Sequence, residues 1–460
     1  MKPVRDLLLF TALLVFFACK KESFTSSASA LLHATADTLH FDTVLTSTGS
    51  TTQVVKIMNE NNKGIHISSV RLAGGAASPF RINVDGVPGP QVTNIDVAAD
   101  DSAYIFVTLN INPNAANLAF IVRDSIEVNY NGNRQYIQLD GYGQNAHFLR
   151  NHVILGSETW NNDLPYVILG RLTVDTNATL IINKGCRIYM HADAPFLVNG
   201  SLQVNGARED TNRVVFTGDR LDEPYRNFPA SYPGLVFTDV SRNNRLDYAI
   251  IKNAYEGIVA VSPAVGTKLT LNQTIIDNAY DAGLTGVHTS ITATNLLVSN
   301  CGKNIILVQG GNYSFVHCTA VAFSNSFVQH KDPSLIVTNY LNQQGADLTA
   351  LFRNCIFWGE NNGLVNDEVV LSKQAGAAFS VSFDQVLWRV QTTPANATIA
   401  GAINQNPAFD SVNTNQRIYS FRLKDGSPAI NKGVNTGVSL DLDGNHRPVG
   451  LPDLGAYEKQ

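Results

Sequence analysis

Two carboxylates and one ammonium group occupy the same position of a phrase that recurs along the chain. The phrase is IIKNAYEGI, then IIDNAYDAGL, then LVSNCGKNI, and three residues after its asparagine come Glu256, Asp281 and Lys303. If the phrases stack, two carboxylates about 5 Å apart could perform retaining glycoside hydrolysis or bind sugar hydroxyl groups. The simpler alternative, which we favour, is a solvated turn in which Lys303 pairs with Asp281.

Two tyrosines accompany these charged residues. Tyr255 and Tyr280 each lie two residues after the asparagine of their phrase, so stacked phrases would make their rings neighbours. Aromatic rings beside carboxylates are the composition of a sugar-binding ladder, although tyrosine packing on tyrosine is the plainer reading. A ring separation above about 10 Å, two strand spacings, would exclude the ladder. Lys252 and Asp277, which precede the first two asparagines, predict a surface ion pair between phrases.

The segment 218–234, GDRLDEPYRNFPASYPG, is the most charged and aromatic loop in this part of the chain. Long loops on a rigid scaffold are frequent sites of binding. Arg220, Tyr225 and Arg226 are therefore candidates for ligand contact, against the favoured alternative of an ordinary insertion.

The segment DLDGN at 441–445 is similar to part of a calcium-binding loop, in which alternate oxygens converge on the ion. The distal glutamate of the full loop is missing, because position 452 is proline. Asp441, Asp443 and Asn445 could bind calcium in another geometry, but a turn held by aspartate–backbone hydrogen bonds is favoured. No other cofactor is expected.

The elements that position these residues follow from the spacing of the phrase. Its asparagines, Asn253, Asn278, Asn300 and Asn325, are 25, 22 and 25 residues apart. Such repeats indicate a solenoid, and their short β-rich pieces without long helical periods favour a parallel β-helix. Stacked coils would place the four asparagines in one structural column at a tight turn, where asparagine tolerates left-handed backbone angles.

The rest of the chain also predicts strands. Residues 36–145 alternate apolar and polar residues between turns, which is typical of a β-sandwich. Residues 146–402 carry the repeats. Residues 403–460 are expected to fold over the last coil and cover its unpaired strand edges. The predicted fold class is all-β: an N-terminal β-sandwich, a right-handed parallel β-helix and a C-terminal cap.

The N-terminus predicts export. Two basic residues precede the apolar run LLLFTALLVFF, which is too short to span a bilayer. Residues 1–19 are expected to form a signal peptide that ends at Cys19, and residues 20–35 a flexible tether. The four other cysteines lack CxxC spacing, which argues against zinc; although export would permit disulfides, we favour buried free thiols. These are Cys186, Cys301, Cys318 and Cys355.

Several segments resemble known families. The sequence around Cys19 resembles a bacterial lipoprotein signal, which implies lipidation of that cysteine. Residues 36–145 resemble the immunoglobulin-like domains of Bacteroidetes surface proteins, and the coils that begin LTVDTNATLIINKGCRIYM resemble the pectin-lyase-like β-helix superfamily. The ending DLDGNHRPVGLPDLGAYE resembles the closing segment of bacterial surface β-helix proteins.

Composition narrows the function. Charged residues are 15% of the chain and the net charge is −5, with no basic stripe, which argues against nucleic-acid binding. The resemblances imply a lipid-anchored protein at the outer membrane or cell surface of a Gram-negative bacterium, with a polysaccharide or surface protein as partner. We expect a non-catalytic module for glycan or protein binding and adhesion. The alternative is a polysaccharide lyase or glycoside hydrolase that acts on an acidic glycan in the β-helix groove; its catalytic residues cannot be assigned.

Overall fold

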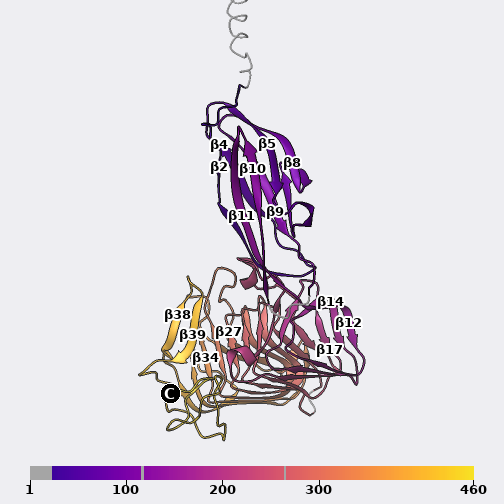
Figure 1. Cartoon of the computed structure of the whole chain (residues 1–460). Coiled ribbons are helices and arrows are strands. Elements are labelled where there is room, and N and C mark those ends of the chain that lie inside the picture. Colours follow the sequence, from indigo (N-terminus) through magenta and orange to yellow (C-terminus); the bar gives the residue numbers. More distant parts are fainter. Residues whose placement is uncertain (1–22, 115–118, 264–265) are drawn as a thin grey trace, which may run out of the picture. The chain divides into compact units, whose positions relative to one another are not determined.

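The computed structural model describes residues 23–114, 119–263 and 266–460. Strands dominate, and the described helices are three short 3-10 turns, η1 (Gly75–Ala77), η2 (Asp210–Asn212) and η3 (Tyr225–Asn227). Within those ranges no helix has the length and apolar character needed to cross a membrane. The chain divides into two compact units, residues 1–145 and 146–460 (Figure 1). The predicted signal peptide and Cys19 lie outside the described residues.

The first unit contains two sheets. One has the order β1-β5-β10-β11-β3 with β8 beside β5, and the other has the order β2-β4-β9-β6-β7. Alternate residues point inward, as at Ile105 and Val107 of β9, and a single hydrophobic cluster takes side chains from both sheets. The strands are β1 (Phe24–Thr25), β2 (His33–Ala34), β3 (Thr38–Leu45), β4 (Gln53–Asn59), β5 (Gly64–Leu72), β6 (Phe80–Val84), β7 (Val87–Gly89), β8 (Gln91–Val97), β9 (Asp101–Leu109), β10 (Phe120–Tyr130) and β11 (Asn133–Gln144).

The segment expected to be a flexible tether is folded from residue 23 onward. Strand β1 pairs with β5, strand β2 pairs with β4, and Leu32 is buried in the hydrophobic cluster. The flexible tether was predicted from the polar residues of this segment, but its apolar residues contribute to the hydrophobic core. The first unit therefore begins before residue 36.

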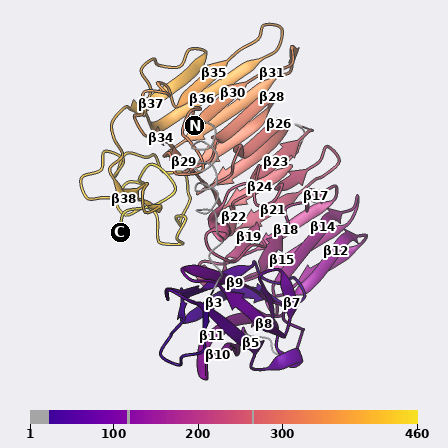
Figure 2. The same cartoon turned by 90° about the horizontal axis from the view of Figure 1, so that it is seen from above.

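The second unit is built on one sheet of 24 strands in which every pair is parallel (Figure 2). This arrangement confirms the all-β prediction and is consistent with a β-helix. The strands are β12 (His147–Ile154), β13 (Ser157–Trp160), β14 (Tyr166–Val174), β15 (Thr179–Asn183), β16 (Arg187–Met190), β17 (Phe196–Val198), β18 (Ser201–Asn205), β19 (Val214–Gly218), β20 (Leu235–Phe237), β21 (Asn244–Asp247), β22 (Ala249–Lys252), β23 (Ile258–Val261), β24 (Leu269–Asn272), β25 (Ile275–Asp277), β26 (Ala282–Thr294), β27 (Leu297–Ser299), β28 (Lys303–Val316), β29 (Thr319–Ala322), β30 (Leu335–Thr338), β33 (Leu348–Arg353), β34 (Ile356–Gly359), β35 (Val369–Ser372), β36 (Phe379–Trp388) and β37 (Ala397–Ile403).

Strands pair with their equivalents in the next coil, and most of these partners are not neighbours in sequence. Strands β20, β21 and β22 pair with β23, β24 and β25 respectively. In this register Ile251 lies beside Ile276, which lies beside Val298, and all three are fully buried. Vertical columns of apolar side chains thus fill the interior of the stack.

Three of the four predicted asparagines form a column at one corner of the coils. Asn253, Asn278 and Asn300 follow β22, β25 and β27 at equivalent positions, with φ of 65°, 56° and 53°. The Asn278 Nδ2 donates to the Asn253 Oδ1 at 2.8 Å. The prediction for Asn325 is wrong. The strand register pairs Ser299 with Val321, so the position equivalent to Asn300 is Ala322, three residues before Asn325.

A second corner carries left-handed residues of mixed type. They follow β21, β24, β26, β28 and β33 at equivalent positions, where the backbone must turn within one residue. They are Tyr248, Gln273, Asn295, His317 and Asn354, with φ between 45° and 55°.

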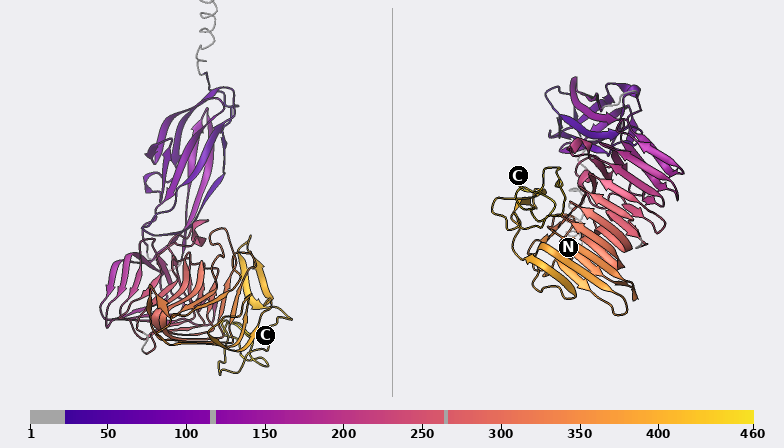
Figure 3. Two further views of the ribbon diagram at one scale, coloured as in Figure 1. Left: turned by 180° about the vertical axis from the view of Figure 1, so that it is seen from behind. Right: turned by 90° about the horizontal axis from the view of Figure 1, so that it is seen from below.

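The C-terminal segment lies along the side of the stack, which corrects the expectation that it folds over the last coil (Figures 2 and 3). The C-terminal segment begins with the hairpin of β38 (Phe409–Asn413) and β39 (Ile418–Leu423). A separate two-stranded sheet, formed by β31 (Tyr340–Leu341) and β32 (Gln344–Gly345), lies in a loop earlier in the chain. Apolar side chains of the segment pack on outward-facing residues of several coils. Those coil residues are Leu297, Val321, Ile356 and Leu387.

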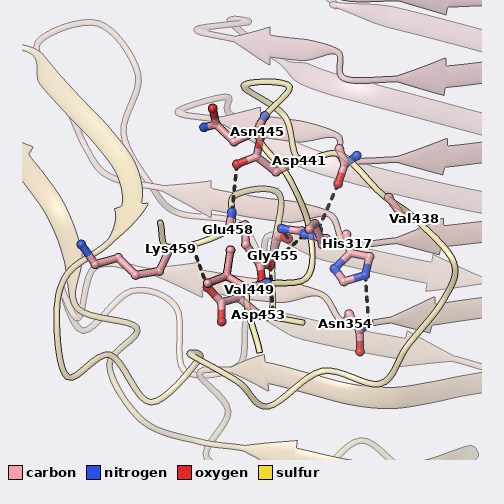
Figure 4. Close-up of polar contacts among 12 residues, drawn as sticks. His317, Asn354, Val438, Asp441, Asn445, Val449, Asp453, Gly455, Glu458 and Lys459 are labelled. Atoms are coloured by element: carbon pink, nitrogen blue, oxygen red, sulfur yellow. Dashed lines mark hydrogen bonds and ion pairs between the residues drawn. The ribbon is translucent and has the colours of Figure 1, made fainter. Parts of the chain in front are cut away.

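Polar contacts fix the tail, residues 424–460, to the second corner (Figure 4). Arg447 and Glu458 form a fully buried ion pair, 2.9 Å between Nε and Oε2, and Arg447 also donates to the Asn295 Oδ1 at 3.0 Å. Asn354 binds the tail at Val434 through both atoms of its amide. The resemblance at the C-terminus therefore falls on residues that hold the tail against the coils.

Candidate functional site

The predicted tyrosine pair is formed at the surface of the second unit. The rings of Tyr255 and Tyr280 are stacked, with centroids 5.8 Å apart and planes inclined by 29°. The two side chains are 46% and 52% exposed. Their separation is within the limit set for a ladder, because equivalent turns of adjacent coils lie one strand spacing apart. We call this pair the tyrosine ladder.

Glu256, Asp281 and Lys303, the charged residues of the repeated phrase, interact with one another. The Lys303 Nζ lies 2.7 Å from the Asp281 Oδ1, as the solvated-turn reading predicts. Glu256 is half-buried, and burial, followed by the nearby charge of Asp281, raises the pKa of its carboxyl. This corner thus combines an aromatic face with one ion pair and a carboxyl group that takes up a proton more readily than usual.

Four charged side chains of the loop 218–234 pair within the loop, whereas Asp219 pairs with His191 outside it. Arg220 makes two 2.8 Å hydrogen bonds to Asp222 and lies 4.0 Å above the ring of Tyr225. Arg226 forms an ion pair of 2.5 Å with Glu223. The backbone of the loop binds the coils, since the Asn253 Nδ2 donates to the Arg226 carbonyl oxygen at 2.9 Å. These contacts support an insertion that is braced against the asparagine column.

The oxygens proposed for calcium are occupied by protein donors. The Asp441 carboxylate accepts from the backbone N–H groups of Asn445 and Glu458, the Asp443 carboxylate accepts twice from Arg422, and the Asn445 Oδ1 accepts from Arg208. Across the described part of the chain, His, Cys, Asp and Glu residues form no group of three suited to a metal ion.

The four described cysteines are buried free thiols, as the sequence indicated. Burial raises the pKa of Cys186 to about 11 and that of Cys301 further still. Both thiols are therefore protonated and unreactive at neutral pH.

A polar cavity that the sequence analysis missed lies between the asparagine column and the C-terminal hairpin. Its volume is about 350 Å³. We call it the asparagine pocket. It is lined by Asn227, Lys252, Asn253, Asp277, Asn278, Asn300, Asn325, Gln416, Arg417 and Tyr419.

Asp277 and Lys252 are partners in the strand register, but the predicted ion pair between them is not among the ion pairs of the described residues. The Asp277 Oδ1 accepts from the Ser299 Oγ at 2.6 Å, and the described ion pairs do not include one to Lys252. Burial raises the pKa of Asp277 and lowers that of Lys252. The polar residues before each asparagine were a signal for this site, but the hairpin that closes it lies more than 100 residues further along the chain.

Comparisons with known proteins do not assign a family. No protein-family model matches the sequence, and the comparison with curated proteins gives no match. Among solved structures, a family 123 glycoside hydrolase from Clostridium perfringens is similar over 25% of this chain and 26% of its own, at 11% identity and a TM-score of 0.18. The PapD-like domain 7 of human CEP192 is similar over 27% of this chain and 91% of its own, at 9% identity and a TM-score of 0.18. The chain thus spans about a quarter of the length of the first of these proteins.

Proposed function

We propose that the second unit is a non-catalytic glycan-binding module whose contact surface is the tyrosine ladder. The observation that carries this proposal is the exposed, stacked pair of Tyr255 and Tyr280. Aromatic faces offer large apolar contact area to the C–H face of a sugar ring. A few polar groups beside that area fix the orientation of a ligand, and Glu256, Asp281 and Lys303 supply them.

We further propose the cellular setting of this module. The parallel sheet supports a right-handed β-helix of the pectin-lyase-like type, and the two sheets around one core support an immunoglobulin-like sandwich in the first unit. The apolar run before Cys19 supports export and a lipid anchor. Together these features favour a lipoprotein at a bacterial surface that adheres to polysaccharide or to a surface protein.

Glycan cleavage is a second candidate, favoured by one observation. The pKa of Glu256 is raised by burial and by Asp281, and a carboxyl group with a raised pKa beside a second carboxylate is the pattern of a glycosidase acid and its partner. The ion pair of Asp281 with Lys303 weighs against this role, because it occupies one oxygen of the second carboxylate.

A glycan array probed with the full chain tests the proposal. The alternative is tested by measuring the reducing ends and unsaturated products released from each retained glycan. Replacing both ladder tyrosines, Tyr255→Ala with Tyr280→Ala, should weaken binding of a retained glycan about tenfold or more. Each lost aromatic contact is worth about 0.5–1.5 kcal/mol, and 1.4 kcal/mol is a factor of ten.

Tyr142→Ala is the matched control, because Tyr142 is 52% exposed, as Tyr280 is, but belongs to the first unit. The control should bind as the unaltered chain does. Equal affinity of the ladder variant and the control would exclude the ladder, and release of cleaved products would replace the binding function with the catalytic one.

A further inference from the structure

The asparagine pocket contains polar atoms that the protein leaves without partners. Asn278 is 5% exposed, and its Oδ1 has no hydrogen-bond partner among the described residues, although its Nδ2 donates to both the Asn253 Oδ1 and the Asn227 carbonyl oxygen. The Tyr419 hydroxyl, on the opposite wall, is likewise buried and unpaired within the described chain. Buried polar groups are nearly always satisfied, so these two require an explanation. An amide oxygen accepts hydrogen bonds, so a donor satisfies it.

The charge of the pocket is positive. Lys252 and Arg417 line it, and the ion pairs of the described residues include neither of them. The Arg417 Nη2 donates to the Asn227 carbonyl oxygen at 2.9 Å, and its guanidinium lies 4.8 Å from the ring of Phe327, so these contacts hold it in place. Asp277 is the one carboxylate of the lining and acts electrostatically on both Lys252 and Arg417, so the lining has two cationic side chains and one carboxyl group.

The positive region continues beyond the pocket. A second cavity of about 340 Å³ shares Asn227 and Lys252 with it and is also lined by Arg187, Arg220 and Arg226. Arg220 and Arg226 pair with Asp222 and Glu223, so Lys252 and Arg187 are the cations of this lining that lie outside the ion pairs of the described residues. A concave surface lined by one sign of charge concentrates ligands of the opposite sign.

We propose that the asparagine pocket binds a compact hydroxylated anion, a small molecule that carries one negatively charged group and at least one hydroxyl donor. Lys252 and Arg417 would face the anionic group. A ligand hydroxyl would donate to the Asn278 Oδ1, and the Tyr419 hydroxyl would bind a second ligand oxygen. A volume of about 350 Å³ is near the lower end for small-molecule sites, which suits one sugar-sized unit rather than a chain. This site is separate from the tyrosine ladder and does not depend on it.

Calorimetric titration of the full chain with four probes tests the site. The probes are glucuronate, glucose 6-phosphate, glucose and inorganic sulfate. Either hydroxylated anion should bind at least about tenfold more tightly than glucose, which lacks the charge, and than sulfate, which lacks the hydroxyl framework. The carboxylate and phosphate probes distinguish the two sources of charge.

Two variants locate the binding. Lys252→Met with Arg417→Gln should weaken it about tenfold or more, and Tyr419→Phe, which keeps the ring and removes only the hydroxyl, should weaken it several-fold. The charge-matched control is Lys424→Met with Arg171→Gln, two exposed positions outside the pocket lining. Circular dichroism reports whether each variant is folded, and Tyr419→Phe still decides the question if the double variant is not.

Three results would overturn the proposal: no binding of either hydroxylated anion, equal binding of glucose or sulfate, or unchanged binding by both pocket variants. The ladder variant separates this outcome from that of the proposed glycan binding. It should bind the small anions normally even if the array retains no glycan.

Discussion

At the scale of single residues, asparagines with a left-handed backbone differ in whether their side chains also make structural hydrogen bonds. Asn354 has φ of 55°, is fully buried, and joins the coil to the tail through hydrogen bonds of 2.8 and 3.0 Å with the backbone of Val434. Asn177 has φ of 68° but is exposed. The first residue combines a backbone role with a side-chain role, whereas the second has mainly the backbone role.

We expect Asn354→Ala to lower the free energy of unfolding by about 3 kcal/mol, because it strains the left-handed backbone and leaves buried polar groups of the tail unpaired. Asn177→Ala should cost only about 1 kcal/mol, the backbone part. Urea unfolding monitored by circular dichroism compares the two. Equal losses would show that the bonds to Val434 contribute nothing.

At the scale of elements, the tail depends on a neutral histidine. The Nε2 of His317 accepts from the Asn354 Nδ2 and lies 3.1 Å from the Thr436 Oγ1 of the tail. Burial, with the nearby charge of Arg447, lowers the pKa of His317 to about 3. A protonated ring would lose its acceptor and place a second cation beside Arg447.

We expect acid to weaken this part of the structure. The folded pKa lies below the unfolded value of about 6.5, so the stabilisation from a neutral His317 is complete above pH 6.5 and is lost as the pH falls towards 3. At pH 5 the loss relative to pH 7 should be about 2 kcal/mol.

The comparison of unaltered chain with His317→Gln isolates this effect, since glutamine already occupies the left-handed position of this corner at Gln273. Burial raises the pKa values of Asp441, Asp453 and Glu458 in the tail. These raised values make the free energy of unfolding depend on pH in the opposite direction, and this effect is common to both proteins. Between pH 7 and pH 5, the melting temperature should fall more for the unaltered chain than for His317→Gln. Parallel changes would contradict the assignment to His317.

At the scale of the whole molecule, each unit has a hydrophobic core of its own. Ile105 is fully buried in the cluster of the first unit, and Leu284 is fully buried between Ile258 and Ile305 in the second. Separate cores permit separate unfolding.

We expect differential scanning calorimetry to resolve two transitions. Ile105→Ala should lower only one of them and Leu284→Ala only the other, each by the temperature equivalent of about 2–5 kcal/mol. A single transition that shifts with both substitutions would show that the units unfold together.

The sequence predicted the parts of this fold that repeat. One recurring phrase was enough to predict an all-β chain with parallel strands and the asparagine column, because strand pairing between equivalent positions turns a sequence period into a vertical row. It misplaced Asn325 because a spacing of 25 recurred by chance after strand β29, where the chain leaves the stack.

The remaining features depend on contacts between residues that do not recur at a regular spacing in the sequence. The second corner uses tyrosine, glutamine, asparagine and histidine at one structural position, so no residue type marks it. The asparagine pocket joins Asn227, Lys252 and Arg417 from three distant segments. The tail packs along the coils because its apolar residues match outward-facing apolar residues on several strands, which the alternating pattern alone assigned to solvent.

The tail binds coils that are far apart in the stack, since Arg213 donates to the Leu442 carbonyl oxygen at 2.6 Å and Asn354 binds Val434. In an ordinary solenoid each coil depends only on the coils next to it, and the ends fray independently. Here residues 424–460 tie together coils that are encoded much earlier in the sequence. The stack cannot gain its full rigidity until residues 424–460 have been synthesised, and proteolytic removal of that segment would loosen coils more than 200 positions upstream.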